Sequence, residues 1–82
     1  MRADRLDDLE HALIEMIQIE VTAGKPVGPE TDLLLTGLVS SISVVRIVTW
    51  LEEHLDIEID PVDVILENFQ TVALMVDYAG RR

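Results

Sequence analysis

Two adjacent serines, Ser40 and Ser41, have the residue type and the setting that most readily suggest chemistry. They follow Gly37-Leu38-Val39 and precede the amphipathic pattern Ile42-Ser43-Val44-Val45, so the Ser41 hydroxyl is expected in the first turn of a helix. The amino end of a helix offers unpaired N–H groups and positive partial charge, which favour an attached or bound phosphate. Serine is also a common capping residue, so the spacing alone leaves a purely structural role for Ser41 open.

Four carboxylates fall in the register of a calcium-binding loop: Asp56, Glu58, Asp60 and Glu67 occupy its positions 1, 3, 5 and 12. Position 6 of such a loop is a glycine that permits a sharp turn, whereas this sequence has Pro61, whose ring forbids that backbone. The register therefore argues against an EF-hand.

The remaining residues give little support to catalysis. His11 and His54 are far apart and the chain has no cysteine, so neither a transition-metal site nor a Cys–His nucleophile pair is indicated. Ser41 also lacks the Gly-x-Ser-x-Gly setting of a hydrolase nucleophile. The sequence thus predicts no metal site and no catalytic residue.

The composition fits one small globular domain over residues 1–82, with 49% hydrophobic and 27% charged residues. Sixteen acidic against six basic side chains give a net charge of -10, which repels nucleic acids and anionic lipids and favours partners with a basic patch. No apolar run approaches the roughly 18 residues of a membrane span, and no secretory signal is evident. We therefore expect a cytoplasmic monomer that binds neither nucleic acid nor membranes.

The elements that must position Ser41 begin with an amphipathic helix, which runs from Leu6 with Asp4 as its N-cap. Glycines and prolines follow, so this helix is predicted to end between Val21 and Ala23. Roughly Lys25 to Val39 is then a long loop, and its apolar side chains are expected to pin it. The expected core positions of the helix are Leu9, Leu13, Met16 and Ile17.

A second helix is predicted from Ser40 or Ser41 to about Leu55, and it carries two apolar stripes. The core stripe consists of Val44, Ile47, Val48, Leu51 and Leu55. The second stripe consists of Ile42, Val45 and Thr49, with Glu52 and Glu53 beside it. Because the first stripe suffices for packing, the second is predicted to be exposed and to bind protein.

The rest of the chain predicts two further helices. Asp60-Pro61 is expected to provide the N-cap and first residue of a short helix that reaches about Leu66. A fourth helix is expected to begin at Asn68 or Gln70 and to close at Gly80, and its inward positions are Val72, Met75, Val76 and Ala79. The predicted fold class is all-α: a small four-helix bundle of three longer helices and one short helix, with a long loop between helices one and two.

Four segments carry a shared pattern: Thr31-Asp32-Leu33, Gly37 to Val45, Trp50 to Leu55, and Glu67 to Val72. Together with the first helix they cover nearly the whole chain, and they resemble the acyl carrier protein family. Members of that family are acidic four-helix bundles of about this length, in which the serine of an Asp-Ser-Leu motif carries 4'-phosphopantetheine through a phosphodiester. The resemblance implies that Ser41 is the attachment point, with Ile42 in the place of the leucine.

Two residues depart from the family pattern. Ser40 stands where the family has an aspartate; it can still cap the helix, but the carboxylate that the family presents to the modifying transferase is missing. Slower modification, or a need for a particular transferase, is therefore expected, and Ser40 itself is a less favoured rival for the attachment. Arg46 stands where relatives often have an acidic residue, so the recognition face is mixed in charge or, alternatively, Arg46 only covers apolar surface.

The resemblance implies a carrier rather than an enzyme. An acyl or aminoacyl group would be held as a thioester on the arm, which comes from coenzyme A, and Met75 is expected to line a shelter for it. The implied partners are a phosphopantetheinyl transferase and acyl- or aminoacyl-loading and transferring enzymes with basic docking patches. The residues expected to recognise them are Ser40, Ile42, Val45, Arg46, Thr49, Glu52 and Glu53.

Two questions stay open at the level of sequence. Fatty acid, polyketide and nonribosomal peptide pathways all use such carriers, and no residue pattern selects one cargo. The alternative function is an unmodified acidic helical adaptor, in which Ser41 only caps the second helix while Ile42, Val45 and Thr49 bind a fixed partner. The missing aspartate favours this alternative.

Overall fold

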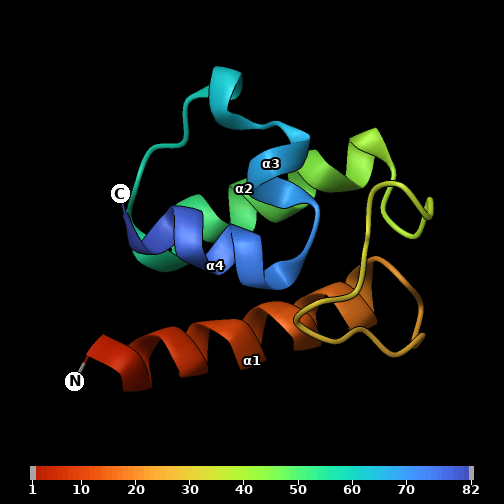
Figure 1. Cartoon of the computed structure of the whole chain (residues 1–82), viewed down its shortest axis with the longest axis horizontal. Helices are drawn as coiled ribbons and strands as arrows, with labels where there is room; N and C mark the ends of the chain where they lie inside the picture. Colours follow the sequence, from red (N-terminus) through yellow and green to blue (C-terminus); the bar gives the residue numbers. More distant parts are fainter. Residues whose placement is uncertain (1, 82) are drawn as a thin grey trace.

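The computed structural model describes the backbone of residues 2–81 and the side chains of residues 8–81. Its elements are α1 (Arg2–Glu20), α2 (Ser41–Leu55), the 3₁₀ turn η1 (Pro61–Asp63), α3 (Leu66–Phe69) and α4 (Val72–Gly80). In Figure 1, α1 runs along one side of the molecule below α4, and α2 passes behind α4. Residues 2–81 form only helices, turns and loops, which confirms the predicted all-α bundle of three longer helices and a short one.

Helix α1 begins earlier than predicted and ends one residue sooner. It starts at Arg2, so Asp4 lies inside the helix and is not its N-cap; the side chains of Asp4 and Leu6 lie outside the described residues. At the other end, the N–H groups of Val21 and Thr22 both donate to the Ile17 carbonyl at 2.9 Å. The backbone then turns left-handed at Ala23, with φ of 55°, which ends the helix.

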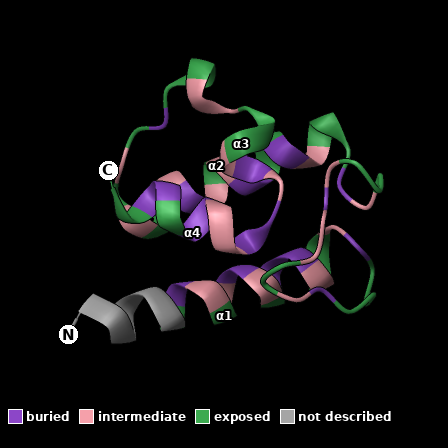
Figure 2. Ribbon diagram, in the orientation of Figure 1, coloured by how far each residue is buried: buried purple, intermediate pink, exposed green. Residues whose placement is uncertain are grey.

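The core forms where the four helices meet, and Figure 2 shows the buried residues gathered there. Helix α4 packs against both α1 and α3. The predicted inward positions are confirmed: Leu9, Leu13, Met16 and Ile17 on α1, Val44, Ile47 and Leu51 on α2, and Val72, Met75, Val76 and Ala79 on α4 are all buried. Val48 and Leu55 of the core stripe are half-buried against this cluster. Burial of such side chains stabilises a fold by about 1.5–3 kcal/mol each.

The segment after α2 differs from the prediction, because no single helix spans Asp60 to Leu66. The Asp60 carboxylate accepts a hydrogen bond from the Val62 N–H at 3.1 Å and caps η1 as expected. The helix then stops, since Val64 leaves helical geometry and Ile65 is extended, with φ of -128° and ψ of 164°. A new helix, α3, starts at Leu66.

Two hydrogen bonds to Asp63, from residues later in the chain, explain this break. The Tyr78 hydroxyl donates to the Asp63 carboxylate at 2.8 Å, and the Asn68 side-chain amide donates to the Asp63 carbonyl at 2.9 Å. These bonds fix the end of η1 from α4 and α3, so local helix propensity does not decide the path of the chain.

Helix α4 begins at Val72, later than predicted. Thr71 is its N-cap, and the Thr71 hydroxyl oxygen accepts a hydrogen bond from the Leu74 N–H at 3.1 Å. Within the described residues, no helix has both the length and the apolar character that crossing a bilayer requires.

Candidate functional site

The two serines have different roles at the start of α2. Ser40 has extended backbone angles, φ of -82° and ψ of 168°, and its hydroxyl oxygen accepts a hydrogen bond from the Ser43 N–H at 3.3 Å. The Ser40 carbonyl accepts the first intrahelical bond, from the Val44 N–H at 3.0 Å. Ser40 is therefore the N-cap and Ser41 is the first helical residue, which decides between the two helix starts that the sequence left open.

The Ser41 side chain is exposed. Among the described residues its hydroxyl has no hydrogen-bond partner, while the Ser40 hydroxyl also donates to the Ser43 hydroxyl oxygen at 3.3 Å. The capping role that the adaptor alternative assigned to Ser41 is thus filled by Ser40. The Ser41 oxygen lies at the positive end of a helix and is accessible to a second molecule.

A closed loop brings the chain to Ser41. Leu33 and Val39 are buried, and the Val39 N–H donates to the Leu33 carbonyl at 2.9 Å, which closes the loop at its base. At the tip, the Gly37 N–H donates to the Leu34 carbonyl at 3.2 Å, and Gly37 has φ of 79°. This left-handed conformation is costly for residues with a Cβ, so the loop that leads to Ser41 requires glycine at this position.

Replacement of Gly37 with alanine is expected to lower the free energy of unfolding by about 1 kcal/mol, because alanine is strained at positive φ. Steric overlap is not the cause of this loss, since nothing lies within 4 Å of the added Cβ. Urea unfolding measures the change. Gly28→Ala is the matched control, because Gly28 is not at positive φ and its Cβ would meet only the Thr31 hydroxyl oxygen, at 3.4 Å. Equal losses at both positions would contradict the backbone explanation.

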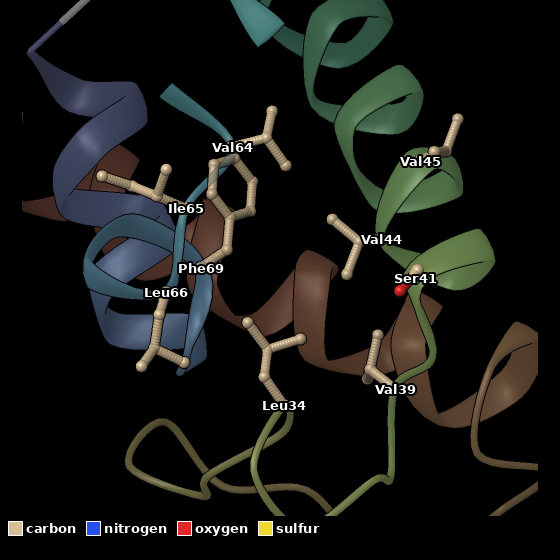
Figure 3. A pocket seen from close by; sticks show the side chains of 9 residues that line it. All are labelled: Leu34, Val39, Ser41, Val44, Val45, Val64, Ile65, Leu66 and Phe69. Atoms are coloured by element: carbon tan, nitrogen blue, oxygen red, sulfur yellow. The ribbon is translucent and has the colours of Figure 1, made fainter. Parts of the chain in front are cut away.

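Ser41 lies on the rim of a hollow between α2 and α3, called here the α2–α3 hollow, of about 350 Å³. In Figure 3, α2 and the closed loop form one side and α3 with the residues before it forms the other. Apart from Ser41, the lining is apolar: Leu34, Val39, Val44, Val45, Val64, Ile65, Leu66 and Phe69. An attachment point and an apolar recess are therefore adjacent.

A second hollow, of about 410 Å³, continues from the first along α2 and shares Val45 and Val64 with it. Glu52 lines this second hollow, and its carboxylate accepts a hydrogen bond from the Ile59 N–H at 2.9 Å. Glu52 therefore holds the chain segment after α2. This intramolecular role was not predicted for Glu52.

The outer face of α2 carries the other predicted recognition residues. Ile42 and Val45 are 83% and 63% exposed, whereas Leu51 is fully buried, which confirms that the second stripe is exposed and the first is not. Arg46, Thr49 and Glu53 are also exposed, on the same face. We call Ile42, Val45, Arg46, Thr49 and Glu53 the outer face of α2.

Arg46 has an ion pair that sequence reasoning missed. Its guanidinium nitrogen Nη1 lies 4.0 Å from Glu20 Oε1 at the end of α1, and the two side chains are 60% and 51% exposed. A pair this open contributes at most about 1 kcal/mol, so the guanidinium can exchange partners at little cost. The mixed charge expected of this face is present.

Trp50 and His54 lie at the edge of the outer face. Their rings stack, with centroids 4.5 Å apart and an interplanar angle of 11°. Trp50 is half-buried against the core and also lines a shallow surface depression together with Ile42, Arg46 and Glu53. Trp50 therefore packs against the core and also lies beside the outer face of α2.

Other residues lie where the sequence did not place them. Met75, expected to line a shelter for cargo, is fully buried in the core and does not line the α2–α3 hollow. The apolar run Val64-Ile65-Leu66 lines it instead. In the sequence, this wall of the hollow is indicated only by three consecutive apolar residues shortly before Phe69. The side chains of residues 8–81 contain no group of three or more histidines, aspartates or glutamates placed to hold a metal ion.

Comparison with known proteins agrees with this geometry. The family model described as "Phosphopantetheine attachment site" matches residues 8–79. No curated protein and no solved structure matches the chain. The matched residues include the two serines, the closed loop, α2, α3 and almost all of α4. The chain therefore belongs to the phosphopantetheine attachment site family, whose domains carry 4'-phosphopantetheine covalently, as the resemblance to acyl carrier proteins predicted.

Proposed function

We propose that this protein is an acyl carrier in which Ser41 holds the 4'-phosphopantetheine arm. The observation that carries the proposal is the Ser41 hydroxyl: it is exposed, without a hydrogen bond among the described residues, and on the rim of an apolar hollow. The first-turn N–H groups and the helix dipole favour the negative charge of a phosphodiester at this point. Ser41 therefore fits the group, whereas the Ser40 hydroxyl is used in the cap.

The attachment is a substitution at phosphorus. The Ser41 oxygen forms a bond to the phosphate that carries pantetheine in coenzyme A, 3',5'-ADP leaves, and the hydroxyl proton passes to the transferase. The attached arm supplies a terminal thiol that holds an acyl or aminoacyl group as a thioester. The apolar walls of the α2–α3 hollow support a role in covering the apolar part of a cargo.

We further propose that the outer face of α2, with Ser40, is the surface on which partner enzymes dock. Exposed Ile42 and Val45 beside Ser41 provide the apolar contact. Glu53 and the exposed acids that follow α2, Asp56, Glu58 and Asp60, favour a partner with a basic patch. Arg46 is the exception on this face and favours partners that place a carboxylate against it. Glu52 contributes to this docking surface only indirectly, because its carboxylate holds the chain segment after α2 at Ile59.

Measurement of intact mass tests the proposal. After incubation of the folded protein with coenzyme A and a broad-specificity phosphopantetheinyl transferase, we expect each chain to gain one phosphopantetheine group. A folded protein that gains none with several transferases would contradict the carrier function. That result would support the acidic helical adaptor, for which the absence of the family's aspartate at Ser40 is the specific argument.

A further inference from the structure

Asp32 lies directly before the closed loop that precedes Ser41, and it accepts hydrogen bonds from two residues of that loop. One carboxylate oxygen, Oδ1, accepts a hydrogen bond from the Leu35 N–H at 2.9 Å, and the other, Oδ2, accepts one from the Gln70 side-chain amide at 2.8 Å. The Asp32 carbonyl accepts a third bond, from the Thr36 hydroxyl at 2.5 Å. Hydrogen bonds to an ionised carboxylate are stronger than those between neutral groups, so Asp32 orders both the inside of the loop and its link to Gln70.

Gln70 ties this loop to α3. Its own N–H donates to the Leu66 carbonyl at 2.9 Å, which fixes Gln70 at the end of α3. Its carbonyl accepts a hydrogen bond from the Leu33 N–H at 2.8 Å, in addition to the side-chain bond to Asp32. Two bonds therefore join Gln70 to the start of the loop, and the side-chain bond spans 38 residues of sequence. We call the side-chain pair the Asp32–Gln70 clasp.

The clasp is connected to Ser41 through the backbone. Leu33 directly follows Asp32 and is held separately by the backbone carbonyl of Gln70, and its own carbonyl accepts the hydrogen bond from Val39 that closes the loop. Val39 is buried and directly precedes Ser40, the N-cap of α2. Ser41 is thus two residues beyond the last residue that the loop fixes.

The clasp also joins opposite walls of the α2–α3 hollow. Leu34 and Val39 of the loop line it, as do Leu66 and Phe69 of α3 (Figure 3). Gln70 directly follows Phe69, so the clasp links the α3 wall to the loop wall. The same contact therefore lies between the segment that leads to Ser41 and the recess beside Ser41.

From these contacts, and on the basis of the carrier function proposed above, we propose that Asp32 and Gln70 are positioning residues for Ser41. They hold the closed loop and the start of α2 in the one conformation that the phosphopantetheinyl transferase binds. Without the clasp only a fraction of the molecules has Ser41 correctly presented. The apparent KM of the transferase for the protein then rises by the inverse of that fraction, while kcat is unchanged once the complex has formed.

The test compares Gln70→Leu with a matched control, Gln18→Leu. Gln18 is also half-buried, and it holds an earlier part of the segment between α1 and α2. Its side-chain oxygen accepts a hydrogen bond from the Val27 N–H at 2.8 Å. Gln18 is not linked to Asp32. With a broad-specificity transferase and coenzyme A, we expect Gln70→Leu to raise KM about tenfold with kcat unchanged. Gln18→Leu should change KM less than about twofold. An unchanged KM in Gln70→Leu, or equal rises in both variants, would overturn the proposal.

Exchange of the two partners provides a second test. Gln70→Glu places two carboxylates together and should raise KM, while Asp32→Asn combined with Gln70→Glu restores a donor and an acceptor and should return KM toward the wild-type value. The combined variant should unfold at the same urea concentration as the wild type. If its KM nevertheless stays raised, the positioning role of Asp32 and Gln70 is contradicted.

Amide hydrogen exchange on the unmodified protein separates this inference from the carrier function. Gln70→Leu should speed exchange at Val39 but not at Val27, and Gln18→Leu should do the reverse. If the wild type accepts no phosphopantetheine, the carrier function fails, and the clasp is then judged by exchange alone. Unchanged exchange at Val39 in Gln70→Leu would refute it.

Discussion

Replacement of Ser41 with alanine is expected to abolish the gain of phosphopantetheine completely, because it removes the protein's oxygen atom from the proposed phosphodiester. The fold should be unaffected: the Ser41 side chain is exposed and has no hydrogen-bond partner among the described residues. Surface substitutions of this kind change the free energy of unfolding by no more than about 0.5 kcal/mol. Intact mass after treatment with coenzyme A and transferase, together with urea unfolding, measures both quantities.

Ser40→Ala is the reciprocal control. It leaves Ser41 in place, so the phosphopantetheine gain should persist, but it removes the oxygen that accepts the Ser43 N–H. Loss of an N-cap costs about 1 kcal/mol, so this variant should be the less stable of the two. A mass gain in Ser41→Ala, together with its loss in Ser40→Ala with the fold intact, would assign the attachment to Ser40.

Replacement of Phe69 with alanine should cause the largest loss of stability, about 3–5 kcal/mol. Phe69 is 1% exposed, lies under the α2–α3 hollow, and its ring is 5.8 Å from that of Tyr78 in a tilted arrangement. Alanine leaves a cavity that the short α3 cannot close, since Gln70 at its end is held by Asp32 and Leu33. A protein of 82 residues has a total stability of roughly 4–12 kcal/mol at 0.05–0.15 kcal/mol per residue, so much of it would be lost.

Urea unfolding checks this expectation, with two comparisons. Phe69→Leu retains most of the buried volume and should cost distinctly less than the alanine variant. Val62→Ala removes an apolar side chain that is 74% exposed and should leave stability almost unchanged. A loss of under about 1 kcal/mol in Phe69→Ala would show that the packing beneath the hollow is loose.

The sequence predicts α2 and its two stripes well, because the signals there are local. A capping serine, the helical spacing of apolar residues and the glycine before them all lie within a short stretch, and Ser40, Val44 and Ile42 take the cap, core and surface positions expected of them. The inward face of α4 follows from spacing in the same way.

The failures have a common cause, which is side-chain hydrogen bonds that the spacing of apolar residues does not reveal. The helix predicted from Asp60 to Leu66 is broken because Tyr78 and Asn68 hold Asp63. The helical spacing that places Glu52 beside the exposed stripe gives no sign that its carboxylate binds the Ile59 N–H. The pairing of Asp32 with Gln70 has no counterpart in any local pattern, since each is an ordinary polar residue in its own segment.

The stacked pair Trp50 and His54 has a practical consequence. Trp50 is the single tryptophan of the chain and borders the outer face of α2, so its ultraviolet emission can be excited selectively. A partner that covers Ile42 and Arg46 would alter the solvent around the indole ring. The protein thus contains a native optical reporter beside the proposed docking surface, and association with candidate enzymes that lack tryptophan can be titrated without an added dye.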